Sequence, residues 1–155
     1  MNNNSNERPV ARFIEKWRFL GHIHEEYAKS RGMTLMAFMV LEIIYMNPGC
    51  CTQKLICEQS LYAKQSVNAI IRTLWTRGYV VLNVDDRDRR NRSIVLTEKG
   101  QKYADKIIGE YLIVEKEAME HLSGDQWEQL VGLAETYAEH FSAGMTKLIQ
   151  ASEEE

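Results

Sequence analysis

Two short helical segments separated by only three residues constrain the fold of this chain more than any other feature. Residues 52–59 are predicted to form one helix, which Thr52 caps, and residues 63–77 a second helix, which Gly78 ends. The intervening Ser60-Leu61-Tyr62 is short enough to predict a helix-turn-helix unit. In the second helix, apolar residues recur at i, i+3, i+4 and i+7 and must face the core: Val67, Ile70, Ile71 and Leu74.

The opposite face of that second helix is polar, contains no acidic residue, and is long enough to enter a DNA major groove. Gln65 and Asn68 have amide groups that can hydrogen-bond adenine, and Arg72 can bind guanine or a phosphate. Tyr62 stands where Ser or Asp would usually cap, which would leave backbone N–H donors for a DNA phosphate. The candidate DNA contacts on this helix are Ala63, Lys64, Gln65, Ser66, Asn68, Ala69 and Arg72.

A predicted β-hairpin follows directly. Apolar runs at residues 79–82 and 94–96 flank residues 85–92, which include four arginines and three aspartates. Such a tip can reach a phosphate backbone or a narrow groove. Because its net charge is only +1, we expect the placement of one arginine, Arg90 above all, to matter more than total charge. The candidate contacts in the tip are Arg87, Asp88, Arg89, Arg90 and Arg92.

The distribution of charge supports an anion-binding face in the middle of the chain. The chain has a net charge of −3, yet residues 62–102 contain nine basic and four acidic side chains, a net +5. A basic middle within an acidic chain is typical of local binding to nucleic acid. A solvated charged surface would give the same pattern, so charge alone leaves both interpretations open.

The other segments predict a mainly α-helical protein with one small hairpin. We expect a disordered head at 1–7, a dimerisation helix at 8–32, a DNA-binding domain at 33–100, further dimerisation helices at 101–150 and an acidic tail at 151–155. Thr34 and Thr97 are predicted helix caps, and Ser123 with Gln126 forms a capping box. The terminal helices have too many apolar residues for one small domain to cover, which predicts an obligate homodimer.

Several of these runs together resemble the MarR (multiple-antibiotic-resistance regulator) family. The resemblance rests on Thr52-Gln53-Lys54, Lys64-Gln65-Ser66-Val67-Asn68, Asp88-Arg89-Arg90 and Leu96-Thr97-Glu98-Lys99-Gly100, with Leu74 and Gly78 between them. It covers residues 33–103 well and both ends more loosely. It implies a dimeric winged helix-turn-helix repressor that binds a pseudo-palindromic double-stranded operator and is released by a small aromatic effector.

The resemblance also implies roles for individual residues. Arg90 would enter the minor groove, and Asp88 would hold the wing in shape by pairing with a neighbouring arginine. Aromatic residues of the first two helices, Trp17, Tyr27 and Phe38, could contact an effector, although side chains at this spacing more often form core. The chain departs from the family pattern at Ala37, at Leu55-Ile56-Cys57 and at Trp75, where we expect the indole to pack against its surroundings.

Other functions remain open alternatives. The chain could be a winged-helix dimer that acts through protein–protein contacts, or a redox-sensing regulator that uses Cys50 and Cys51. The histidines lack the spacing of a metal site, and we find no catalytic motif and no reason to expect a cofactor. The sequence contains neither a signal-peptide pattern nor a membrane span, which predicts a cytoplasmic protein.

Overall fold

The computed structural model describes the backbone of residues 4–85 and 88–153, and the side chains of residues 9–83 and 92–152. It divides into two compact units, one up to Tyr111 and the other from Leu112 onward. Within the described residues, no helix is both long enough and apolar enough to cross a membrane.

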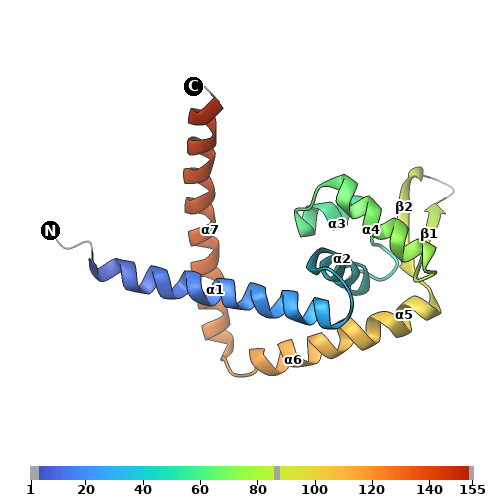
Figure 1. The fold of residues 1–155 in the computed structure, drawn as a ribbon, viewed down its shortest axis with the longest axis horizontal. Helices are drawn as coiled ribbons and strands as arrows, with labels where there is room; N and C mark the ends of the chain where they lie inside the picture. Colours follow the sequence, from blue (N-terminus) through green and yellow to red (C-terminus); the bar gives the residue numbers. More distant parts are fainter. Residues whose placement is uncertain (1–3, 86–87, 154–155) are drawn as a thin grey trace. The chain divides into compact units, whose positions relative to one another are not determined.

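Four helices open the first unit (Figure 1). They are α1 (Asn4–Ser30), α2 (Leu35–Met46), α3 (Gln53–Ser60) and α4 (Lys64–Thr76). The predicted caps are confirmed, because the hydroxyl of Thr34 accepts from Ala37 N and that of Thr52 from Leu55 N. The sequence predicts that the first helix starts at residue 8, but α1 begins at Asn4. The backbone of residues 4–7 is therefore helical and is not part of a disordered head.

The hairpin is longer than the sequence predicts. Strand β1 (Val80–Asp85) pairs antiparallel with β2 (Asp88–Leu96), and the ladder runs from Val80↔Leu96 to Asp85↔Asp88 with an irregularity after Val84. The segment predicted as a loop tip is therefore mostly strand, since β2 includes Arg89, Arg90 and Arg92.

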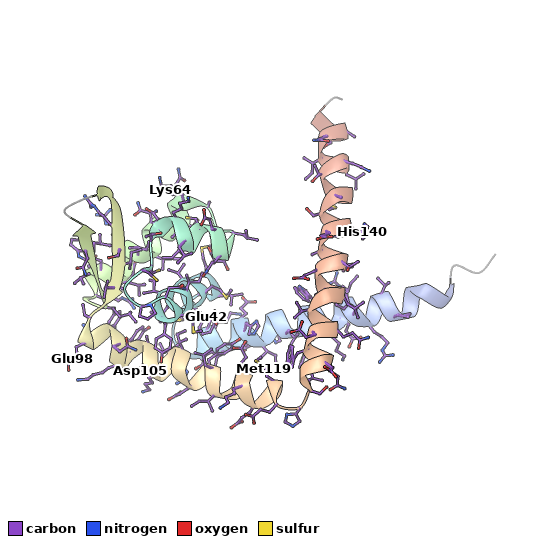
Figure 2. All side chains as sticks on the ribbon, turned by 180° about the vertical axis from the view of Figure 1, so that it is seen from behind. Glu42, Lys64, Glu98, Asp105, Met119 and His140 are labelled. Carbon is purple, nitrogen blue, oxygen red and sulfur yellow. The ribbon has the colours of Figure 1, made fainter. Side chains whose placement is uncertain are left out.

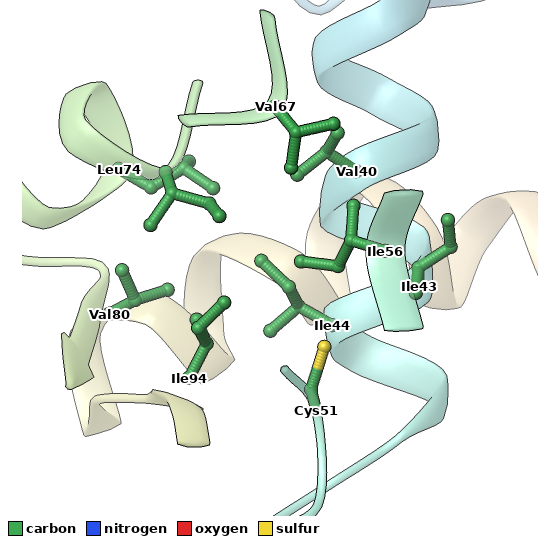
Figure 3. Packing of buried hydrophobic residues seen from close by; sticks show 10 residues of the cluster. Val40, Ile43, Ile44, Cys51, Ile56, Val67, Leu74, Val80 and Ile94 are labelled. Carbon is green, nitrogen blue, oxygen red and sulfur yellow. The ribbon is translucent and has the colours of Figure 1, made fainter. Parts of the chain in front are cut away.

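One hydrophobic core joins α2, α3, α4 and both strands (Figure 3). Its members are Val40, Ile43, Ile44, Cys51, Ile56, Val67, Ile71, Leu74, Val80 and Ile94. The predicted inner face of α4 is confirmed: Val67, Ile71 and Leu74 are buried, and Ile70 packs against the cluster. Because these side chains interlock with the hairpin, the outer face of α4 has a fixed orientation relative to the wing.

The sequence predicts one regular helix after the hairpin, but in the structure the helical winding of this segment changes midway. It comprises α5 (Glu98–Ala104), a π-helical turn η1 (Asp105–Gly109) and α6 (Glu110–Met119). Hydrogen bonds from distant helices meet the π turn: the Tyr27 hydroxyl donates to Ile107 O at 2.7 Å, and the Tyr45 hydroxyl to Asp105 Oδ1 at 3.1 Å. The sequence shows no local signal for this insertion, which is often found at functional sites.

The second unit is dominated by α7 (Gly124–Glu153). The predicted capping box is confirmed, because Ser123 N donates to Gln126 Oε1 at 2.8 Å and Gln126 N to Ser123 Oγ at 3.3 Å. The predicted boundary at residue 150 is wrong, since the helix continues through residues 151–153.

Candidate nucleic-acid interface

The outer face of α4 presents the residues predicted to contact DNA. Four of them lie within about 100° of one another around the helix, since an α-helix turns 100° per residue: Lys64, Gln65, Asn68 and Arg72. All four are exposed, as are Ala63 and Ala69, whereas Ser66 is half-buried. Figure 2 shows Lys64 above the core helices, with Glu98 at the start of α5 below them. Their contact with DNA stays a prediction.

The N-terminus of α4 lacks a side-chain cap. We expected Tyr62 at the capping position, but the N-cap is Ala63, and Tyr62 is half-buried against the core. Alanine has no acceptor, so no side chain caps this helix end, whereas threonine hydroxyls cap α2, α3 and α5. The first N–H groups of α4 are therefore available to an anion, as predicted, but the residue that leaves them uncapped is Ala63 and not Tyr62.

A surface groove lies beside this helix end, formed by α3, the segment just before it, the start of α4 and strand β2 of the wing. We call it the α3–α4 groove; it is lined by Thr52, Gln53, Lys54, Cys57, Glu58, Lys64 and Arg92. Three cations and one carboxylate line it, so its charge favours an anion. Gln53 Nε2 donates to Lys64 O at 3.3 Å, which ties α3 to the start of α4.

Sequence reasoning missed Gln53 and Lys54 as candidate site residues. The available signal was the Thr52 cap. Because Thr52 caps a helix that starts at Gln53, Gln53 and Lys54 lie in the first turn of α3. The hairpin completes this arrangement, since Ile94 N donates to Cys51 O at 2.7 Å and Thr52 forms a β-bridge with Ser93. The long-range pairing brings Arg92 to Lys54 and Lys64, and no local sequence pattern predicts it.

The wing arginines are only partly covered by the structure. Arg92 is the wing arginine whose side chain lies within the described residues, and it is exposed in the α3–α4 groove. Arg87 lies outside the described residues, as do the side chains of Asp88, Arg89 and Arg90. The predicted minor-groove role of Arg90 and the pairing of Asp88 therefore stay predictions.

The three cysteines have different environments. Cys51 is fully buried in the core, and this burial raises the pKa of its thiol to about 11. A thiol with a raised pKa is a poor nucleophile at neutral pH, which argues against a vicinal sensor built on Cys50 and Cys51. Cys50 is exposed, and Cys57 packs partly against the core.

The structure does not bring together the three candidate effector residues. Tyr27 and Phe38 contact each other edge to face, with ring centroids 5.8 Å apart, and both rings also approach Tyr111. Trp17 lies ten residues before Tyr27 on α1, is 66% exposed and approaches Phe13 instead. Trp75 was expected to pack, but its side chain is 56% exposed near the end of α4. Within the described part of the chain, no three His, Cys, Asp or Glu side chains form a group that could hold a metal ion.

Comparison with known proteins shows which family the winged helix-turn-helix unit is similar to. Residues 31–91 match the model described as the MarR family. The chain is 28% identical over 135 residues to YkoM, a helix-turn-helix-type transcriptional regulator of Bacillus subtilis that is described as uncharacterised. The match covers 83% of this chain and 87% of YkoM.

Solved structures share the fold at lower identity. A MarR family regulator from Neisseria meningitidis superposes with a TM-score of 0.75 at 20% identity, covering 95% of this chain and 99% of that one. The S. aureus MepR–DNA complex gives a TM-score of 0.63 at 20% identity, with 82% and 97% covered. Rhodococcus jostii CouR bound to p-coumaroyl-CoA gives 0.63 at 19%, with 78% and 87% covered. Residues 31–91, which contain most of the winged helix-turn-helix unit, thus match the MarR family, YkoM is similar along most of the chain, and the chain shares the fold of a solved MarR family regulator.

Proposed function

We propose that this protein is a homodimeric, sequence-specific DNA-binding repressor whose release from DNA is triggered by a small aromatic effector. The observation that supports DNA binding best is the exposed polar face of α4, which continues into the cationic α3–α4 groove. The core holds this face rigidly, and a rigid helix presenting amide and cationic side chains suits the major groove. S. aureus MepR, which shares this fold, has been solved in complex with DNA.

In the proposed complex, α4 enters the major groove and the hairpin lies along the adjacent minor groove. Gln65 and Asn68 would contact bases, because their amides can both donate and accept. Lys64, Arg92 and the uncapped start of α4 would contact phosphates, which fix the position of the helix without selecting a sequence. Lys54 lies in the same groove and would add a further phosphate contact.

The homodimer is supported by apolar side chains that the single chain leaves exposed. On α1 these include Val10, Phe13, Trp17, Phe19, Leu20 and Ile23. On α7 they include Leu130, Val131, Leu133, Tyr137, Phe141, Met145, Leu148 and Ile149. Apolar faces of this length are rare on monomers and mark a protein interface. A two-fold dimer predicts a pseudo-palindromic operator, with half-sites about one helical turn apart.

Two substitutions on α4 separate phosphate contact from base contact. We expect Lys64→Ala to weaken binding to all duplexes and to lower the slope of log K against log salt by about 1 per half-site. We expect Asn68→Ala to leave that slope unchanged, but to cost about 1–3 kcal/mol on the selected operator and to relax one base preference. Fluorescence anisotropy across a salt series, on operator and random duplexes, measures both effects.

Lys102→Ala is the matched control for charge. Lys102 lies on α5 and pairs with Glu98 at 2.7 Å, away from the proposed interface, so its removal should leave operator affinity within about twofold of wild type. If Lys64→Ala and Lys102→Ala weakened binding equally, the attraction would be non-specific and the α4 assignment would be wrong. If the wild-type protein bound neither duplex, the proposal of DNA binding itself would fail.

The effector proposal rests on the family and on the aromatic cluster formed by Tyr27, Phe38 and Tyr111. The CouR structure contains p-coumaroyl-CoA, a phenolic thioester. We expect a phenolic acid or its thioester to raise the melting temperature of the protein and to release it from operator DNA. A thermal-shift series followed by anisotropy tests this, and compounds that stabilise the protein without releasing DNA would contradict an effector role.

A further inference from the structure

The turn between α3 and α4 contains an unusual backbone conformation. Leu61 has φ 58° and ψ 18°, in the left-handed region, and is the non-glycine residue with positive φ among the residues that the structure describes. Within the described ranges, glycines occupy the other positive-φ positions, which are Gly32, Gly49 and Gly78. A branched side chain is disfavoured in this conformation, and glycine would adopt it without strain.

Burial does not account for a leucine at this position. Leu61 is 88% exposed, more than any other large apolar residue in the part of the chain that the structure describes, while the adjacent Tyr62 packs against the core. The backbone N–H of Leu61 donates to Cys57 O at 3.0 Å, a bond that glycine would also make. Neither the fold of the turn nor its packing therefore requires a leucine.

The position of the turn suggests what the side chain contacts. In a helix-turn-helix the first helix crosses the DNA backbone, and the start of the second contacts base edges, so the turn between them lies at the edge of the major groove. Leu61 lies three residues before Lys64, and Lys64 is the first residue of the uncapped helix α4. The C5 methyl of thymine is the apolar group that the major-groove edge offers to an aliphatic side chain.

We propose that Leu61 is a specificity-determining residue that contacts a thymine methyl group in each half-site. This inference rests on the proposed DNA binding. When the thymine methyl packs against the exposed Leu61 side chain, apolar surface of both groups is removed from water. This burial stabilises the complex and contributes nothing to the free protein. The strained conformation is then retained for recognition, at the expense of the stability of the free protein.

A methyl-deletion cycle tests the proposal. An operator selected from a random DNA pool is synthesised with each thymine replaced in turn by uracil, which removes the C5 methyl and leaves base pairing intact. We expect one symmetric position at which uracil weakens wild-type binding by about fourfold per half-site, the effect of one buried methyl group. At that position Leu61→Gly should bind thymine and uracil operators equally.

Leu61→Gly should also melt at a higher temperature than wild type while binding the thymine operator more weakly, with an unchanged salt slope. Leu61→Asn is the second variant, because asparagine tolerates positive φ and has no methyl-binding surface, and it should show the same equal binding. The inference is overturned if wild type is insensitive to uracil at every position, or if uracil affects both variants as it affects wild type. Failure of wild type to bind any duplex would instead overturn the proposed function.

Discussion

Gly100→Ala should destabilise the DNA-binding unit by about 3–5 kcal/mol, among the largest effects available to a single methyl group. A Cβ added at Gly100 would overlap the carbonyl oxygen of Tyr79 and lie 2.7 Å from its carbonyl carbon. These are backbone atoms, so no side-chain rotation can relieve the clash. The first turn of α5 would have to move away from the end of the recognition segment.

That movement would break a set of hydrogen bonds centred on Thr97. Thr97 N donates to Tyr79 O at 3.0 Å, its hydroxyl donates to Gly78 O at 2.7 Å, and Gly100 N donates to that hydroxyl at 2.9 Å. The Tyr79 and Tyr103 rings stack beside them with centroids 4.2 Å apart. Since these contacts join the end of α4 to the start of α5 and to the hairpin, we expect operator affinity to fall together with stability.

Urea unfolding followed by circular dichroism measures the loss for Gly100→Ala. Gly132→Ala is the matched control, because Gly132 lies inside α7 and nothing is within 4 Å of its added Cβ. Alanine stabilises a helix interior by about 0.5–1 kcal/mol over glycine, so the control should be neutral or more stable. A free energy of unfolding for Gly100→Ala within about 0.5 kcal/mol of wild type would show that the close approach is not rigid.

The features that the sequence predicts correctly are those determined by local hydrogen bonds and periodicity. Spacing alone identifies the caps at Thr34, Thr52 and Thr97. In each, the threonine hydroxyl accepts a hydrogen bond from the backbone N–H three residues later. The inner face of α4 follows from the spacing of Val67, Ile71 and Leu74. The exposed face with Gln65 and Asn68 then follows as the opposite side of the same helix.

The features that the sequence misses depend on contacts between distant residues. The π turn is joined by Tyr27 and Tyr45, which are 80 and 60 residues away from their partners. The α3–α4 groove needs the hairpin to bring Arg92 next to Lys64. Trp75 is exposed although aromatic residues usually pack, and nothing in the structure explains this exposure. Periodicity describes one helix at a time and cannot supply these pairings.

Phe141→Asp in α7 should convert the proposed dimer into monomers. Phe141 is 57% exposed in the single chain and stacks with Tyr137 at a centroid distance of 5.7 Å. Helical geometry places Leu130, Phe141 and Leu148 within about 20° of one another along one face. A carboxylate buried at the centre of that face, without a partner, would cost several kcal/mol on each protomer, and two-fold symmetry doubles the cost.

The expected mass from light scattering is 18.0 kDa for the variant, the mass of one chain, and twice that for wild type. Operator affinity should fall by about 100-fold or more, because a monomer binds one half-site without the effective concentration that a dimer provides. Ala143→Asp is the control: it adds the same charge two residues along α7, about 200° around the helix, and should remain dimeric. If Phe141→Asp also remained dimeric, with wild-type affinity, α7 would not form the interface and the exposed face of α1 would be the surface to test next.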